Sequence, residues 1–150
     1  MRTPPLVPDR PDTIDLGEMS CDACPVGCAS GRHAAQFCPF IIRHYERGAE
    51  LCRAGAPADY VWLVKDGVVG LGGGPGEPDH LEALRLPGGY IGLECLVDAS
   101  YRYSARCLSR TVLCGATREG FLRWMRASDE RVRVVVRAII GDPLLAARAL

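Results

Sequence analysis

Four of the eight cysteines lie within eighteen residues near the N-terminus, in the segment CDACPVGCASGRHAAQFC. They are Cys21, Cys24, Cys28 and Cys38, and His33 lies between the last two. Free thiols usually occur singly in protein cores. A cluster of this density therefore indicates a common binding partner, and a metal centre is the first candidate.

Two kinds of metal centre are compatible with these residues, and their spacing alone does not decide between them. An iron–sulfur cubane needs four thiolates around one small object, and the C-x2-C pair of Cys21 and Cys24 supplies two of them. Zinc needs four tetrahedral ligands, which Cys21, Cys24 and two of Cys28, His33 and Cys38 would supply. A loop that binds no metal is the third alternative.

The composition is that of a soluble globular protein with one domain. The chain has 150 residues, of which 48% are hydrophobic and 24% are charged. Eighteen basic and eighteen acidic side chains give a formal net charge of zero, which argues against binding nucleic acid or an anionic membrane with the whole surface. No apolar segment approaches the roughly 20 residues that span a bilayer, and the N-terminus lacks the apolar run of a signal peptide. We therefore predict a cytoplasmic protein without a membrane partner, whose thiols stay reduced and available to a metal.

Short apolar runs separated by glycine and proline follow the cysteine-rich segment. Their number and spacing predict a compact antiparallel barrel or jelly roll. The dipeptide Asp66-Gly67 predicts a two-residue hairpin between the third run and the fourth. The eight predicted strands are Phe40–Ile42, Glu50–Arg53, Tyr60–Lys65, Val68–Leu71, His80–Leu86, Tyr90–Leu93, Tyr101–Leu108 and Thr111–Ala116.

After residue 117 the apolar residues recur at steps of three and four, which predicts helices. Ser128-Asp129-Glu130 predicts the cap and acidic first turn of a second helix, and Gly141-Asp142-Pro143 predicts its end. The predicted fold class is mostly β with a C-terminal α part, a double-stranded β-helix or jelly roll. Its segments are a flexible N-terminus (1–20), a cysteine-rich metal loop (21–39), the β-roll (40–117) and the C-terminal helices (118–150).

Two stretches of the chain resemble a cyclic-nucleotide-binding-type β-roll. The sequence GAELCRAGAPADYVWLVKDG from Gly48 to Gly67 resembles the opening of that fold, which has glycines at its tight turns. The sequence PGGYIGLE from Pro87 to Glu94, with Tyr103-Ser104-Ala105, stands in the place of the phosphate-binding cassette. The likeness covers about residues 40–140. With a cysteine loop in front of the roll, the chain resembles the sensor half of the Crp/Fnr family, specifically its oxygen-sensing Fnr branch.

The resemblance to Fnr proteins implies a [4Fe–4S] cluster. In that branch three cysteines of an N-terminal loop join one distal cysteine on a late strand. Cys114, in the run Thr111-Val-Leu-Cys114, stands where the distal cysteine is expected. Cys21-Asp-Ala-Cys24-Pro resembles the start of the loop, and Gln36-Phe-Cys38-Pro resembles its end. The third loop ligand stays open between Cys28 and Cys38, which lie on either side of the usual spacing.

The implied function is a redox or oxygen sensor that takes part in transcription regulation. Oxidation would change the cluster, reorganise the loop and alter how the helices associate. The alternative is a zinc-stabilised or metal-free scaffold of the same fold that binds a partner protein or a small effector.

Cyclic nucleotide binding is not expected. In cyclic-nucleotide binders of this fold, a cassette glutamate holds the ribose hydroxyl and an arginine pairs with the cyclic phosphate. The glutamate position, directly after Gly89, is Tyr90, and the arginine position, directly before Ser104, is Tyr103. Arg102 is adjacent, but an offset of one residue in a strand turns the side chain to the opposite face. Glu94 is interpreted as structural.

The second predicted helix carries a β-branched apolar stripe at residues 129–140. In the family the corresponding helix forms the dimer interface, so we expect a homodimer through these residues, although the stripe would also serve as core against the roll. No basic recognition helix follows, so this chain alone is not expected to bind DNA directly. No catalytic motif is present, and the protein is predicted not to be an enzyme. The stripe consists of Val132, Val135, Val136, Ile139 and Ile140.

The remaining cysteines and histidines receive a simpler interpretation. Cys52, Cys95 and Cys107 lie inside apolar runs and are predicted to be small buried hydrophobic residues. His44 and His80 have no neighbouring ligand pattern and are predicted to lie at the surface or at a strand edge.

Overall fold

Eight short strands precede two helices in the computed structural model, which describes residues 40–73, 80–127, 129–142 and 144–145. The predicted order of strands followed by helices is therefore confirmed. The elements are β1 (Ile41–Tyr45), β2 (Glu50–Cys52), β3 (Tyr60–Asp66), β4 (Val69–Gly72), β5 (Leu81–Arg85), β6 (Tyr90–Ile91), the 3-10 helix η2 (Leu93–Leu96), β7 (Ser104–Cys107), β8 (Thr111–Thr117), α2 (Arg118–Arg126) and α3 (Asp129–Ile140).

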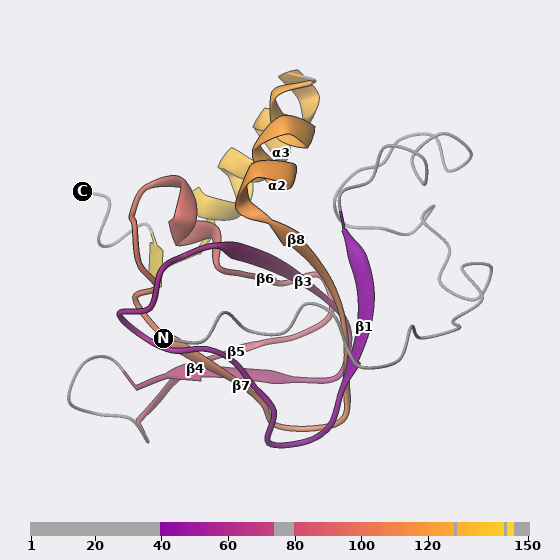
Figure 1. The fold of residues 1–150 in the computed structure, drawn as a ribbon, viewed down its shortest axis with the longest axis vertical. Coiled ribbons are helices and arrows are strands. Elements are labelled where there is room, and N and C mark those ends of the chain that lie inside the picture. Colours follow the sequence, from indigo (N-terminus) through magenta and orange to yellow (C-terminus); the bar gives the residue numbers. More distant parts are fainter. Residues whose placement is uncertain (1–39, 74–79, 128, 143, 146–150) are drawn as a thin grey trace.

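The strands form two antiparallel sheets of four strands each, which face one another in Figure 1. One sheet has the order β1-β8-β3-β6 and the other has the order β2-β7-β4-β5. Because most neighbours within each sheet are distant in sequence, the chain passes repeatedly between the sheets, as in a jelly roll. The predicted fold class is confirmed.

The prediction of a two-residue hairpin at Asp66-Gly67 is wrong. β3 pairs with β6 and β8, whereas β4 pairs with β5 and β7, so this turn carries the chain from one sheet to the other. Gly67 has a φ of +88°, and a Cβ on it would lie 2.4 Å from the carbonyl oxygen of Arg110. The dipeptide correctly marks a reversal that needs glycine. It carries no information on which strand will pair with the next.

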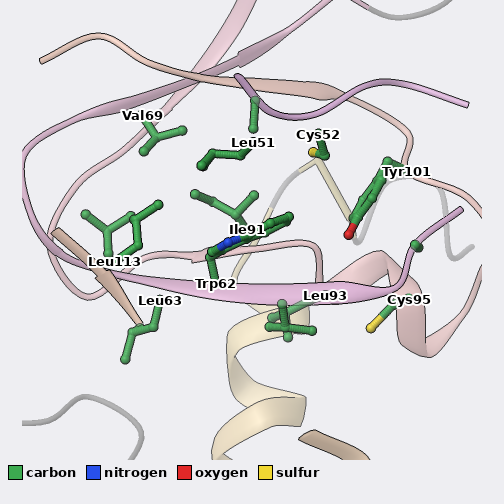
Figure 2. Close-up of a cluster of buried hydrophobic side chains, with 14 of the residues drawn as sticks. Leu51, Cys52, Trp62, Leu63, Val69, Ile91, Leu93, Cys95, Tyr101 and Leu113 are labelled. Carbon is green, nitrogen blue, oxygen red and sulfur yellow. The ribbon is translucent and has the colours of Figure 1, made fainter. Parts of the chain in front are cut away.

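The core lies between the two sheets, around Trp62 (Figure 2). Trp62 and Leu113 have no exposed surface, and Val69 reaches the same interior from the second sheet. Leu63 is equally buried although it lies on the opposite side of β3 from Trp62 in Figure 2. The first sheet is therefore covered on both faces. Each fully buried side chain of this size contributes about 1.5–3 kcal/mol.

The two helices follow β8 directly. Thr117 caps α2, because its hydroxyl oxygen accepts a hydrogen bond from the backbone N–H of Gly120 at 3.1 Å. Phe121 and Trp124 are the buried residues of α2, which packs against β8 and β3. α3 begins with the acidic pair Asp129 and Glu130 and ends at Ile140, as predicted, whereas Ser128 lies outside the described residues. None of the described helices is long and apolar enough to cross a membrane.

Candidate functional site

Cys114 lies in the middle of β8 and is 6% exposed. Its neighbours across the sheet are Ile42 of β1 and Leu63 of β3. Residues directly opposite one another in an antiparallel pair project to the same face of the sheet. Cys114 therefore shares the outer face of the first sheet with Ile42 and Leu63, on the side away from Trp62, and this face is also buried at Leu63 and Cys114.

β1 begins only three residues after Cys38 in the sequence. Phe40, directly before β1, packs edge-on against Phe121 and Trp124 of α2, with ring centroids 5.9 and 6.1 Å apart. Phe121 and Trp124 also stack on one another at 5.7 Å. The chain is thus fixed beside β8 immediately after the cysteine-rich segment.

The four cysteines of that segment, Cys21, Cys24, Cys28 and Cys38, lie outside the described residues together with His33. Within the described ranges, no three histidine, cysteine or acidic side chains gather as ligands of one metal ion. Of the five predicted ligands, the structure therefore places Cys114 alone. It positions Cys114 against the strand that the cysteine-rich segment leads into.

The other three cysteines are buried thiols, as predicted. Cys52, Cys95 and Cys107 are 6%, 0% and 1% exposed. Burial raises the pKa of Cys95 to about 12, and it raises the pKa of Cys52 and of Cys107 as well. Neutral thiols are poor metal ligands and poor nucleophiles. The predicted exposure of His44, on β1, and of His80 is also confirmed.

A second candidate site is a pocket between the β-roll and the residues after α3. Its walls come from β2, β4, β5, the β6–η2 segment and the approach to β7, and it is closed by residues 142, 144 and 145. Its charged residues are Arg85, Glu94 and Asp142, of which the sequence resemblance had placed only Glu94 in the cassette region. The lining consists of Cys52, Leu71, Arg85, Tyr90, Ile91, Gly92, Leu93, Glu94, Tyr103, Asp142, Leu144 and Leu145.

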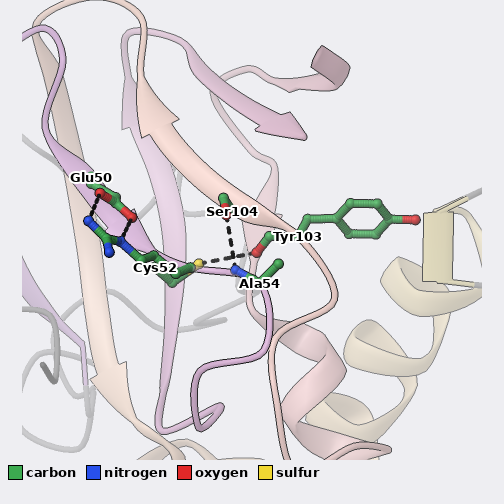
Figure 3. A network of polar contacts seen from close by, with 6 residues as sticks. Glu50, Cys52, Ala54, Tyr103 and Ser104 are labelled. Atoms are coloured by element: carbon green, nitrogen blue, oxygen red, sulfur yellow. Dashed lines mark hydrogen bonds and ion pairs between the residues drawn. The ribbon is translucent and has the colours of Figure 1, made fainter. Parts of the chain in front are cut away.

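Tyr90 and Tyr103, the residues at the predicted nucleotide positions, both line this pocket. Figure 3 shows the Tyr103 ring directed away from β2, toward the C-terminal segments. The Tyr103 carbonyl oxygen accepts a hydrogen bond from the Cys52 thiol at 3.6 Å, and Ser104 Oγ accepts one from the backbone N–H of Ala54 at 3.0 Å. These contacts tie the end of β2 and the residues after it to the start of β7.

Arg102 is not among the residues that line the pocket. Its Nε donates a hydrogen bond to Asp98 Oδ2 at 2.6 Å, forming an ion pair within the loop before β7. Arg102 therefore does not enter the pocket, but the reason is its ion pair in this loop, since residues 102 and 103 lie outside β7 and the strand offset expected from the sequence does not apply there.

Glu94 is a buried carboxyl group on η2, only 6% exposed. Gly92, with a φ of +91°, begins this short helix, and a Cβ there would lie 2.5 Å from the Tyr60 carbonyl oxygen. Burial raises the pKa of Glu94 to about 7, and Asp142 and Asp98 act in the same direction, whereas Arg102 and Arg85 oppose the shift. Glu94 also raises the pKa of Cys52. The carboxyl therefore titrates near neutral pH at the wall of the pocket.

We predict that Glu94→Gln removes a pH-dependent destabilisation. A carboxyl whose pKa is raised on folding destabilises the folded state as pH rises from about 4.5, where the unfolded state ionises, to about 7, where the folded state does. This rise in the pKa of Glu94 corresponds to about 3 kcal/mol of folding free energy. Urea unfolding should show the stability of Glu94→Gln relative to wild type rising by roughly this amount between about pH 5 and pH 8.

The control for this prediction is Glu82→Gln, which removes an exposed carboxyl group on β5. Its stability relative to wild type should vary much less over the same interval. A stability difference between Glu94→Gln and wild type that stays constant from about pH 5 to pH 8 would contradict the assignment.

The fold and the sequence are similar to known sensor domains. The family described as "Cyclic nucleotide-binding domain" matches residues 42–128. No curated protein matches the chain. Among solved structures, the N-terminal domain of a transcriptional regulator from Streptomyces coelicolor A3(2) is 20% identical, with a TM-score of 0.60, over 84% of this chain and 93% of that one.

Two further structures share the fold. The catabolite activator protein of Thermus thermophilus is 26% identical, with a TM-score of 0.62, over 83% of this chain; this chain spans only 58% of its length. The sensor domain of the transcriptional regulator DNR from Pseudomonas aeruginosa is 12% identical, with a TM-score of 0.67, over 89% of this chain and 91% of that one. Because the family match extends over more than half of the sequence, the chain belongs to the cyclic nucleotide-binding domain family.

Proposed function

We propose that this protein is an Fnr-like redox or oxygen sensor whose N-terminal cysteines and Cys114 hold an iron–sulfur cluster of the [4Fe–4S] type that the resemblance implies, and that it acts in transcription regulation. The observation that carries the proposal is the pairing of Ile42 with Cys114. It holds the strand that follows the cysteine-rich segment directly beside the one distal cysteine.

Covalent geometry supports this arrangement. Cys38 is four residues before Ile42, and a chain of four residues reaches at most about 14 Å. Cys114 is on the face of the sheet opposite Trp62, where it is buried together with Leu63. A cysteine at a fixed depth and face of a strand is suited to provide one corner of a cluster. The other corners would be Cys21, Cys24 and either Cys28 or Cys38.

The position of Cys114 also provides a route from the centre to the helices. β8 continues into α2 without an intervening loop, and Phe40 packs on Phe121 and Trp124 of that helix. A change in the conformation of the cysteine-rich segment would pull on Phe40. It would therefore act on the packing of α2 and, through it, on α3.

Replacing Cys114 with alanine should reduce the iron and acid-labile sulfide retained after anaerobic purification by about tenfold or more, because losing a ligand weakens a metal site at least as much as losing an outer-shell contact. The matched control is Cys107→Ala, which removes another buried thiol, 1% exposed against 6% for Cys114, from β7 in the other sheet. That variant should retain iron at the wild-type level.

Iron retention at the wild-type level in Cys114→Ala would contradict the role of Cys114, since the four N-terminal cysteines would then suffice. Stoichiometric zinc in both variants would favour the alternative, a zinc-stabilised scaffold of the same fold.

The output of the sensor is proposed to be a homodimer through residues 129–140. α3 buries Val135 against the rest of the protein but exposes Val136 and Ile140, which are 43% and 70% exposed and lie one turn apart. Val132 is half-buried and lies on the same stripe. A helix that presents one apolar stripe outward while another is buried is suited to pair with a second copy of itself.

A charge placed on this stripe should prevent dimerisation. We expect sedimentation equilibrium to show two chains for the wild-type protein and one chain for Val136→Glu, because a buried unpaired carboxylate disfavours the interface by several kcal/mol. The matched control is Val97→Glu, which changes a valine that is 55% exposed after η2. A monomeric wild-type protein, or a dimeric Val136→Glu variant, would refute this interface.

A further inference from the structure

A largely buried ion pair, with side chains of intermediate exposure, joins the β-roll to the segment that follows α3. Arg85 of β5 donates a hydrogen bond from Nη2 to Asp142 Oδ2, across 57 residues of sequence. The two side chains are only 15% and 13% exposed. Arg85 is also held from the other side, since its Nε donates to the carbonyl oxygen of Tyr90 at 2.9 Å. The guanidinium group is therefore fixed, and the carboxylate of Asp142 is its anionic partner.

The same carboxylate organises the residues behind it. Asp142 Oδ1 accepts a hydrogen bond from the backbone N–H of Leu144 at 3.0 Å, and the Asp142 carbonyl oxygen accepts one from Leu145 at 3.1 Å. Leu145 is 6% exposed, and both leucines line the pocket. Asp142 thus anchors a short apolar segment, Leu144 and Leu145, to the β-roll. We call these two residues the plug.

The plug leaves almost no free space in the pocket. The cavity that remains has a volume of about 10 Å³. That is room for about one water molecule. Any larger ligand would have to displace Leu144 and Leu145. Because these residues follow Asp142 directly, displacing them would also remove the carboxylate from Arg85.

We propose that Arg85 is an anion-binding group, that Asp142 occupies it as an internal substitute for a ligand, and that a small molecule with a phosphate or carboxylate group binds by exchange with Asp142. Arg85 stays paired in both states, so no buried cation is left alone at any stage. The apolar part of the ligand would take the space that Leu144 and Leu145 leave.

The charges around Arg85 are compatible with this exchange. Arg85 and Arg102 face three acidic groups, Glu94, Asp98 and Asp142, and the Asp98–Arg102 pair does not involve Asp142. Replacing one carboxylate by another monoanion therefore leaves the local charge unchanged. The cation is on β5 and not at position 103, so the site differs from the arginine position of cyclic-nucleotide binders. This inference does not depend on the metal centre.

The test is a titration of the full chain with inorganic phosphate at constant ionic strength, with acetate as a second, separate probe. Asp142→Asn keeps the acceptor for Leu144 but removes the charge that pairs with Arg85. If the closed state accounts for about 90–99% of the wild-type protein, removing the internal competitor should tighten phosphate or acetate binding about 10- to 100-fold. Arg85→Gln should abolish this binding, and the matched control Asp98→Asn should bind as wild type does.

A second measurement on the wild-type protein does not rely on substitutions. Saturation with the anion that binds should accelerate amide hydrogen exchange at Leu145, because its N–H donates to Asp142 in the closed state. The proposal is overturned if neither anion binds Asp142→Asn more tightly than wild type, if Arg85→Gln binds as wild type does, or if Leu145 keeps its full protection at saturation.

Discussion

The antiparallel pairing of β1 with β8 is the interaction on which the rest of this structure depends. It extends from Ile41 opposite Gly115 to Tyr45 opposite Thr111, and it sets β1 at the edge of the first sheet. Because β8 leads directly into α2, this single pairing brings three parts of the molecule together. These are the residues that follow the N-terminal cysteines, the central cysteine of β8 and the base of the helices.

A shift of one residue in this register would change the chemistry of the protein. Ile42 and Cys114 lie opposite one another and project to the outer face of the sheet, whereas Leu113 projects into the core. A slip of β1 by one residue would turn Ile42 away from the face that carries Cys114, whereas Cys114 would keep its face because β8 is also paired with β3. The aromatic contacts of Phe40 with Phe121 and Trp124 oppose such a slip, since they fix the start of β1 against α2.

Local patterns of the sequence were sufficient to predict the strands, the helices and the burial of three cysteines. Alternating and continuous apolar runs indicate which residues are buried. The end of α3 is indicated by Gly141 and Pro143. The pairing of strands was less accessible, because Asp66-Gly67 has the same composition whether its strands pair or separate. Cys114 was singled out only through a family resemblance, since a lone cysteine in an apolar run looks like Cys107.

The ion pair between Arg85 and Asp142 could not be found in the sequence by comparable reasoning. Arg85 ends a strand whose other residues gave no sign of a pocket, and Asp142 was interpreted as part of a helix stop. Their contact arises only because the chain after α3 turns back onto the β-roll. One available signal was an acidic residue between glycine and proline that is followed by two leucines, since it marks a short apolar segment with a polar anchor. That signal identifies neither the partner nor the pocket.

The central claim is that the cysteines gather around a redox-active iron centre beside β8, and the most direct test is the metal content of the anaerobically purified wild-type protein. The account predicts a coloured protein with about four iron and four acid-labile sulfide per chain, both of which are lost on exposure to air. A colourless protein that carries stoichiometric zinc, or no iron at all, would contradict it.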